Sequence, residues 1–144
     1  MICYYENRLT DEIINELRES VGWQTFSKEQ ADNAIQMTAS SVVAYDDDQP
    51  IAMGRLVGDG IYYLICDVIV KPDFQKRQVG RMIMDKLLYF AKSNLKLQEK
   101  CSVQLISAYG KEEFYKKVGF KCIPNEESGY GMQLVISNTR IKKE

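Results

Sequence analysis

Apolar residues in this chain recur at two spacings, which separate the expected helices from the expected strands. Residues 79–95 carry the clearest helical pattern, an apolar stripe repeating every three to four positions. Two shorter helices are expected after Thr10 and Ser27, whose hydroxyls can accept the free N–H groups of a first helical turn. A fourth helix is expected at 111–118, where Gly119 supplies a typical C-terminal stop.

Strands are expected where apolar residues run together or alternate between turn signals. The run 61–70, interrupted only by Asp67, predicts a long strand buried on both faces and stopped by Pro72. Residues 46–50 are rich in Asp and favour a hairpin turn over a metal site. The other expected strands are 2–6, 41–45, 51–57, 103–107, 120–123 and 132–136.

The order of these elements predicts a mixed α/β (α+β) fold in one domain covering residues 1–144. A chain of this length can bury a core without staples. Lys142, Lys143 and Glu144 are expected to form a solvated tail.

Charge and composition narrow the function classes. Nineteen basic against twenty acidic side chains give a net charge of −1, which argues against a nucleic-acid partner. No apolar run is long enough to span a bilayer and the first residues lack the pattern of a signal peptide, so we expect a cytoplasmic protein without a membrane partner. Four widely spaced cysteines predict reduced thiols rather than a disulfide framework.

The chain contains no histidine. This absence excludes Ser-His-Asp and Cys-His nucleophilic sites and histidine-ligated zinc, and we expect no metal. Catalysis would have to use tyrosine, carboxylates, lysine, cysteine or backbone groups.

The segment 68–81 is the strongest candidate for a binding site. An apolar strand leads through a short polar loop onto the long helix, whose first N–H groups have no partners inside the helix. Such a helix start attracts phosphate, and Lys76, Arg77 and Arg81 add positive charge around it. Gly80 permits close approach of a ligand. These residues alone do not distinguish a phosphate-binding site from an ordinary solvated helix start.

Two motifs in this order resemble the GNAT superfamily of N-acetyltransferases. Residues 68–80 resemble its acetyl-CoA-binding segment, with Gln75 at the first position of the motif, Gly80 at the last, and Gln78 where the family usually has a glycine. Residues 109–120 resemble the Phe-Tyr-x-x-x-Gly-Phe signature that ends the CoA half of these enzymes. The likeness extends over most of the chain, residues 23–136.

The resemblance implies a fold and a cosubstrate site. The fold would be a strongly twisted mixed sheet of about six or seven strands, flanked by about four helices and splayed between the fourth and fifth strands. Acetyl-CoA would lie in the splay, with its pantetheine along one strand and its diphosphate on the loop and helix start. The implied contacts are Val68, Ile69, Val70, Gln75, Lys76, Arg77, Gln78, Val79, Gly80 and Arg81.

The resemblance also implies transfer of the acetyl group to a primary amine by direct attack, with Tyr115 as the general acid. Asp67 is a candidate base, but strict strand alternation places it on the face of Ile65 and Ile69, opposite Cys66. Only one face can point toward the substrate unless a bulge resets that alternation. Asp67 is therefore expected first to have a structural role, such as capping or pairing with a helix. Cys66 as an acyl carrier is disfavoured because no histidine can activate its thiol.

Two rival functions remain at this point. One is an acyl-CoA-binding sensor or interaction module with the same fold and little catalysis, and the other is a nucleotide-binding or protein-interaction domain. The chain lacks a complete Walker or dinucleotide glycine pattern, which weakens the second rival. The acceptor amine is not specified by any motif, and the resemblance allows a homodimer.

Overall fold

The computed structural model describes residues 1–139 of the chain. These residues form two compact units, Met1–Ile106 and a second that begins at Ser107, and each unit is described by itself. The expected solvated tail at 142–144 lies outside the described residues. A single domain over residues 1–144 stays a prediction.

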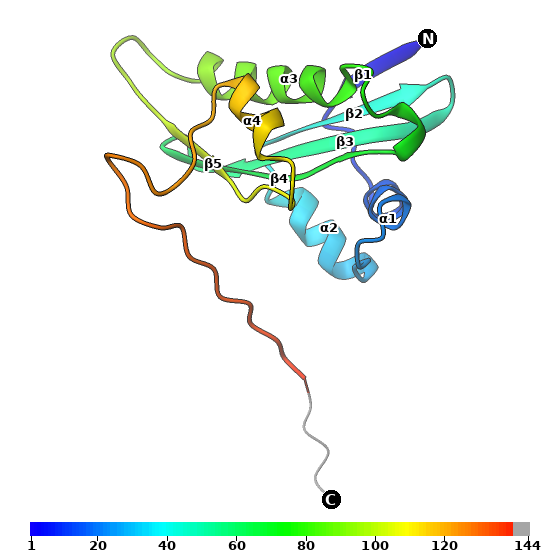
Figure 1. Ribbon diagram of the computed structural model, residues 1–144. Helices are drawn as coiled ribbons and strands as arrows, with labels where there is room; N and C mark the ends of the chain where they lie inside the picture. Colours follow the sequence, from blue (N-terminus) through cyan, green and yellow to red (C-terminus); the bar gives the residue numbers. More distant parts are fainter. Residues whose placement is uncertain (140–144) are drawn as a thin grey trace, which may run out of the picture. The chain divides into compact units, whose positions relative to one another are not determined.

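The first unit is built on a five-stranded mixed sheet (Figure 1). The strands lie side by side in chain order. The first four pair with one another in antiparallel fashion, and the fifth pairs with the fourth in parallel fashion. The sheet therefore needs one crossover connection, which the longest helix provides. The strands are β1 (Ile2–Glu6), β2 (Ser40–Asp46), β3 (Gln49–Gly58), β4 (Tyr62–Val70) and β5 (Ser102–Leu105).

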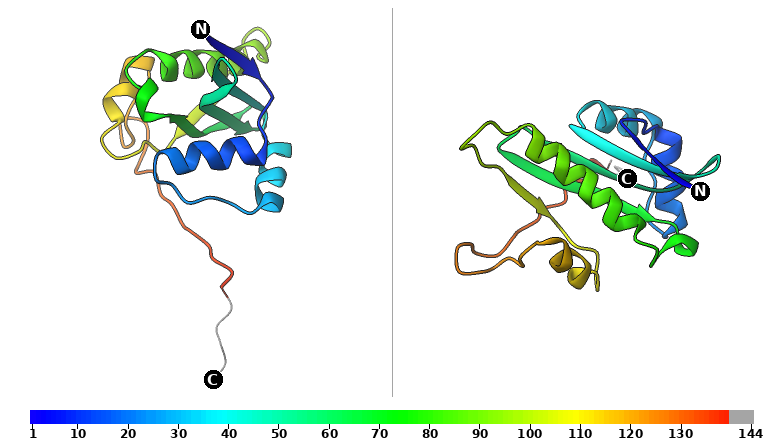
Figure 2. Two further views of the ribbon diagram at one scale, coloured as in Figure 1. Left: turned by 90° about the vertical axis from the view of Figure 1, so that its right-hand side faces the viewer. Right: turned by 90° about the horizontal axis from the view of Figure 1, so that it is seen from above.

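Helices cover both faces of this sheet. Figures 1 and 2 show α3 (Val79–Ser93) on one face, and α1 (Asp11–Ser20) and α2 (Lys28–Gln36) on the other. The predicted caps are confirmed: Thr10 Oγ1 accepts the Ile13 N–H at 3.2 Å, and Ser27 Oγ accepts the Gln30 N–H at 3.1 Å. The 3₁₀-helix η1 (Pro72–Phe74) lies between β4 and α3.

Each helical layer buries its own apolar stripe. On the α1 face, Ile14 and Leu17 pack with residues of three strands, among them Met53 and Ile69. On the α3 face, the predicted stripe of the long helix is buried except at Phe90, which is partly buried, and Met84 is buried beside the stripe. The helix crosses the sheet above Gly54. The buried stripe is Val79, Ile83, Leu87 and Ala91.

A bulge in β4 resets the alternation of side chains along the strand. Arg55 pairs with Cys66, but two residues earlier Met53 pairs with Ile69, so β4 has one residue more than β3 in this interval. Asp67 takes a left-handed conformation there, with φ of 53°. The expectation that Asp67 and Cys66 point to opposite faces is therefore wrong, because the bulge places Cys66 on the Arg55 face, where Asp67 also lies.

The outer edge of β4 is paired over only part of its length. Pairing with β5 runs from Tyr62 to Ile65 and stops at Leu105, whereas β4 continues to Val70. Within residues 1–106, the backbone of residues 66–70 therefore has no neighbouring strand on that side.

The start of β4 is more exposed than its apolar composition predicts. Tyr62 is 66% exposed and Leu64 is 42% exposed, so burial of this strand on both faces is wrong. The alternate residues Tyr63 and Ile65, which point to the other face of the strand, are buried.

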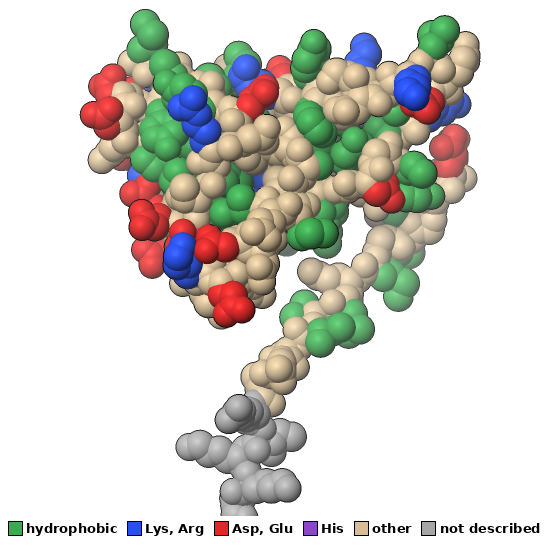
Figure 3. All heavy atoms as spheres, turned by 180° about the vertical axis from the view of Figure 1, so that it is seen from behind, with side chains coloured by type: hydrophobic (Ala, Val, Ile, Leu, Met, Phe, Trp, Pro, Cys, Tyr) green, Lys and Arg blue, Asp and Glu red, His purple; other side chains and the backbone are tan. Residues whose placement is uncertain are grey.

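The second unit contains α4 (Glu112–Val118), which ends at Gly119 as predicted, with φ of 119° at this glycine. The predicted strands at 120–123 and 132–136 are not formed, so the described residues hold five strands instead of six or seven. An apolar run becomes a strand only when a neighbour accepts its backbone hydrogen bonds, and no ladder reaches these residues. The hydrophobic side chains of residues 132–136 are exposed along the extended segment (Figure 3), and Met132 is 94% exposed.

We expect no side chain to fit at Gly54 of β3, because α3 packs directly against this position. A Cβ built there would lie 2.6 Å from Ile83 Cγ2 and 3.1 Å from Leu87 Cδ1. We expect Gly54→Ala to lower the free energy of unfolding by about 1–3 kcal/mol because α3 must shift. Urea unfolding measures this loss. Gly129→Ala is the control, since a Cβ there meets nothing within 4 Å, and equal losses in both variants would contradict the packing described.

Candidate functional site

The start of α3 differs from the starts of the other long helices. At α1 and α2 a side chain caps the first turn and acidic residues follow it, whereas α3 has neither a side-chain cap nor an acidic residue in its first turn. The positive end of its dipole and its first N–H groups are therefore left for another acceptor. This is the arrangement that binds phosphate groups at helix starts.

The loop before α3 has an unusual backbone. Lys76 and Gln78 both have positive φ, 62° and 65°, although neither is glycine. Left-handed residues interspersed in a turn can direct successive N–H groups into one concavity, which is a common anion-binding geometry. The structure thereby explains Gln78, which stands where the related family has glycine. It is the N-cap of α3 in a glycine-like conformation rather than a residue of the helix, as its exposed side chain allows.

The other polar residues of the loop have distinct places. The Gln75 side-chain amide donates to the Val70 carbonyl at 2.9 Å and so fastens the loop to the end of β4. Arg77 lies over the Phe74 ring, 5.3 Å from its centre. Arg81 pairs with Asp85 at 3.1 Å on the exposed side of the helix, and Lys76 is exposed. Positive charge thus surrounds the start of α3.

The strand that leads into this loop can offer only its backbone. Ile69 is 2% exposed and Val68 lies near α3 across from Gly54, so these side chains belong to the interior. The open edge of β4 consists of main-chain groups, which a ligand carrying amides could pair with as an added strand does. Val68, Ile69 and Val70 and the loop residues 75–80 follow one another along this edge.

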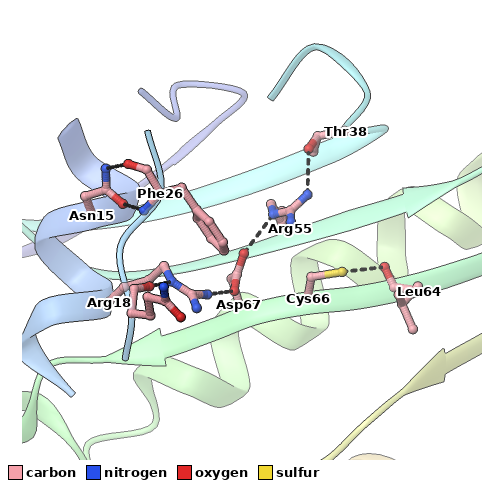
Figure 4. A network of polar contacts seen from close by, with 9 residues as sticks. Asn15, Arg18, Phe26, Thr38, Arg55, Leu64, Cys66 and Asp67 are labelled. Atoms are coloured by element: carbon pink, nitrogen blue, oxygen red, sulfur yellow. Dashed lines mark hydrogen bonds and ion pairs between the residues drawn. The ribbon is translucent and has the colours of Figure 1, made fainter. Parts of the chain in front are cut away.

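Asp67 lies at the bulge between two arginines. Its Oδ1 accepts a hydrogen bond from Arg18 Nη1 of α1 at 2.6 Å, and its Oδ2 accepts one from Arg55 Nε of β3 at 2.9 Å (Figure 4). The three side chains are 10–15% exposed. Both carboxylate oxygens are thus engaged by guanidinium groups, and Asp67 joins α1 and β3 to the bulge of β4.

Arg18 and Arg55 were missed in the sequence. Arg18 lies 49 positions from Asp67, and no spacing or motif joins them. The available signal was a single carboxylate within an apolar strand, because a buried charge requires a partner.

Cys66 is next to Asp67 but is not prepared for nucleophilic chemistry. Burial raises the pKa of its thiol, an effect that the nearby Arg55 charge opposes. The Sγ faces the Leu64 carbonyl at 3.9 Å. A thiol with a raised pKa stays protonated at neutral pH, which argues against an acyl-carrier role.

Tyr115 lies on α4 in the second unit. Its ring makes edge-to-face contacts with Phe114 and Phe120, with centres 5.0 Å and 6.1 Å away. Burial raises the pKa of its phenol above the ordinary value. The phenol therefore stays protonated at neutral pH, as a proton donor requires.

The described part of the chain meets the requirements of neither a metal site nor a membrane-spanning helix. Among residues 1–139, no three His, Cys, Asp or Glu side chains lie together closely enough to hold a metal ion. Every helix there is too short or too polar to cross a membrane.

The conformation of Gln78 predicts an inverted preference between glycine and alanine. At an exposed position inside a helix, Ala is more stable than Gly by about 1 kcal/mol, whereas at positive φ the strain of a Cβ favours Gly. We expect Gln78→Gly to exceed Gln78→Ala in free energy of unfolding by about 1 kcal/mol. The same pair at Tyr89, which is 72% exposed within α3, should give the opposite order. A more stable Ala variant at position 78 would contradict the left-handed conformation.

Comparison with known proteins agrees with this geometry. A model of the acetyltransferase (GNAT) domain matches residues 38–122. A probable acetyltransferase from meticillin-resistant Staphylococcus aureus has a similar structure, with a TM-score of 0.82 and 29% identity. The match covers 94% of this chain and 100% of that one.

Two curated plant proteins are similar in sequence. GCN5-related N-acetyltransferase 1, chloroplastic, from Arabidopsis thaliana is 29% identical over 119 residues, which are 81% of this chain and 58% of that protein. Serotonin N-acetyltransferase 2, chloroplastic, from Oryza sativa subsp. japonica is 27% identical over 136 residues, 88% of this chain and 65% of that protein. The chain thus spans less than two thirds of the length of either relative. The matched domain covers the bulged strand, the loop and the start of α3, and the chain belongs to the GNAT acetyltransferase family.

Proposed function

We propose that this chain transfers the acetyl group of acetyl-CoA to a primary amine by direct attack. One observation carries the proposal: β4 continues past its last pair with β5 and leads through η1 and a short loop to the start of α3, which has basic residues around it and no side-chain cap. An open strand edge followed by an anion site fits a ligand that has amides at one end and a diphosphate at the other.

The cosubstrate would be held mainly by backbone. Acetyl-CoA supplies an activated thioester and carries its own amides in the pantetheine arm. The edge of Val68, Ile69 and Val70 would pair with these amides, and the N–H groups from Gln75 to Gly80 would bind the diphosphate. Lys76, Arg77 and Arg81 would neutralise its charge. Gln75 contributes by holding the loop against Val70.

The chemistry follows from the groups that the chain offers. The amine nitrogen forms a bond to the acyl carbon, the carbon–sulfur bond breaks, and the sulfur leaves as a thiolate. Tyr115 would donate its phenolic proton to that thiolate, and burial, which raises its pKa, keeps the phenol protonated until the thiolate forms. The amine gives up its own proton to water or binds already neutral, because both oxygens of Asp67 are engaged by arginines.

The acceptor is proposed only as a class. The name of the rice relative specifies serotonin, a primary arylalkylamine, as the acceptor of that protein. Arylalkylamines therefore belong in the first panel of amines, beside polyamines, aminoglycoside-like compounds, small metabolites and protein amino groups.

An assay of thiol release tests the proposed function. The protein is incubated with acetyl-CoA and each amine, free CoA thiol is followed, and acetylated product is identified by mass. We expect amine-dependent release with at least one class. Tight binding of acetyl-CoA in calorimetry without release for any amine would instead favour a sensor or interaction module.

Tyr115→Phe tests the general acid. We expect it to lower kcat at least tenfold while the Kd of acetyl-CoA stays nearly unchanged, since only the hydroxyl is removed. Tyr109→Phe makes the same change at a fully exposed tyrosine of the second unit and should leave kcat unaltered. Wild-type turnover in Tyr115→Phe would remove this residue from the mechanism.

A further inference from the structure

Arg18 connects two parts of the first unit that are distant in sequence. Its Nη1 donates to Asp67 in β4 at 2.6 Å, and its Nε donates to the Gln24 carbonyl in the α1–α2 loop, residues 21–27. Its guanidinium also lies over the rings of Phe26 and Trp23, 4.3 Å and 5.4 Å from their centres. One side chain, only 14% exposed, thus contacts three residues of the loop and the bulge of β4.

The α1–α2 loop is held mainly near its two ends, where the Trp23 N–H donates to the Arg18 carbonyl at 2.9 Å and Phe26 packs against the core of the α1 face. Residues 22–25 are exposed and lie outside any helix or strand. Asn15, on the same face of α1 as Arg18, fixes the far end of the loop, since its side-chain amide donates to the Phe26 carbonyl and accepts the Phe26 N–H, both at 2.9 Å. Asn15 therefore ties the loop to α1, Phe26 packs against the core, and Arg18 adds a polar link to the bulge of β4.

Under the proposed function, this link lies where the acceptor amine would approach the thioester. The diphosphate at the start of α3 and the pantetheine along Val68–Val70 would bring the thioester to the bulge, where Asp67 lies. Asp67, Arg18 and the Phe26 ring lie together on the α1 face at this point (Figure 4). An amine that approaches the bulge from that face would pass along the α1–α2 loop.

We propose that Arg18 is a positioning residue, which holds the α1–α2 loop against the bulge of β4 through Asp67 and thereby sets the wall that the acceptor amine contacts. The role of the loop as the acceptor wall rests on the proposed function. The link from Asp67 through Arg18 to the loop does not depend on any activity.

The single tryptophan of the chain reports on this link without a substrate. Trp23 lies in the loop and is 37% exposed, so its fluorescence comes from this position alone. We expect Arg18→Met to raise acrylamide quenching of Trp23 about twofold, because the loop loses its polar link to β4 and the guanidinium that covers the Trp23 ring. Asp67→Asn should act in the same direction, since a neutral amide holds Arg18 more weakly. Arg18→Lys keeps the charge but not the fork of donors, and should fall between wild type and Arg18→Met.

Steady-state kinetics separates positioning from general damage. With an amine identified by thiol release, we expect Arg18→Met to raise the KM for the amine about tenfold, while kcat and the KM for acetyl-CoA stay within about twofold. The conservative Arg18→Lys should restore part of the amine KM. A mere loss of stability would lower all activity or none, and urea unfolding of each variant measures that loss directly.

Arg8→Met is the matched control. Arg8 stacks over the Tyr5 ring at 4.5 Å, so this variant also removes an arginine–aromatic contact, but one outside the loop and β4. Wild-type quenching of Trp23 in both Arg18→Met and Asp67→Asn, or an equal rise in Arg8→Met, would overturn the link. Parallel rises in both KM values would overturn the acceptor wall. If no amine is turned over, the proposed function fails, but the quenching series still decides the link.

Discussion

The architecture around the site depends on the carboxylate of Asp67 held between two guanidiniums. Arg18 comes from α1, Arg55 from β3 and Asp67 from the bulge of β4, so this contact joins a helix and two strands. The three groups are largely buried, and removal of one partner from such a pair typically costs about 3–5 kcal/mol because a charge is left uncompensated. The bulge gives Asp67 the left-handed conformation in which it meets both arginines.

The bulge also determines how the rest of β4 packs against α3. Directly after it, Val68 lies near α3 across from Gly54, where the lack of a side chain lets Ile83 and Leu87 approach β3 closely. The strand then continues to Val70 beyond the reach of β5. Since α3 is fixed over the sheet by its buried stripe, its uncapped start lies a short loop beyond the open edge of β4. Gln75 closes that loop against Val70.

The distribution of proton-handling groups suits a chain without histidine. Both oxygens of Asp67 are engaged by arginines, and burial raises the pKa of the Cys66 thiol, which stays protonated at neutral pH. Burial raises the pKa of Tyr115 and keeps its phenol protonated, while its ring packs edge to face against Phe114 and Phe120. Under the proposed function the chain supplies a proton donor and leaves removal of the amine proton to water.

The backbone of the loop shows how a family motif tolerates a departure. Gln78 has the positive φ that makes glycine the usual choice, at a strain of about 1–2 kcal/mol. Its N–H is retained and its side chain is exposed. Under the proposed function, binding of the diphosphate requires a backbone conformation at this position, which glycine adopts without strain and glutamine adopts with strain.

The sequence by itself determined what local interactions control. The caps at Thr10 and Ser27, the buried stripe of α3 and the stop at Gly119 depend on residues within a few positions of one another, and the structure has them where expected. The family followed from two motifs in order. Only the tertiary structure decided the bulge at Asp67, its partners Arg18 and Arg55, and the left-handed Gln78, since these depend on segments that meet in space. Likewise, the apolar run 132–136 suggested a strand, but a strand needs a neighbour to accept its hydrogen bonds, and the sequence of one segment cannot supply that neighbour.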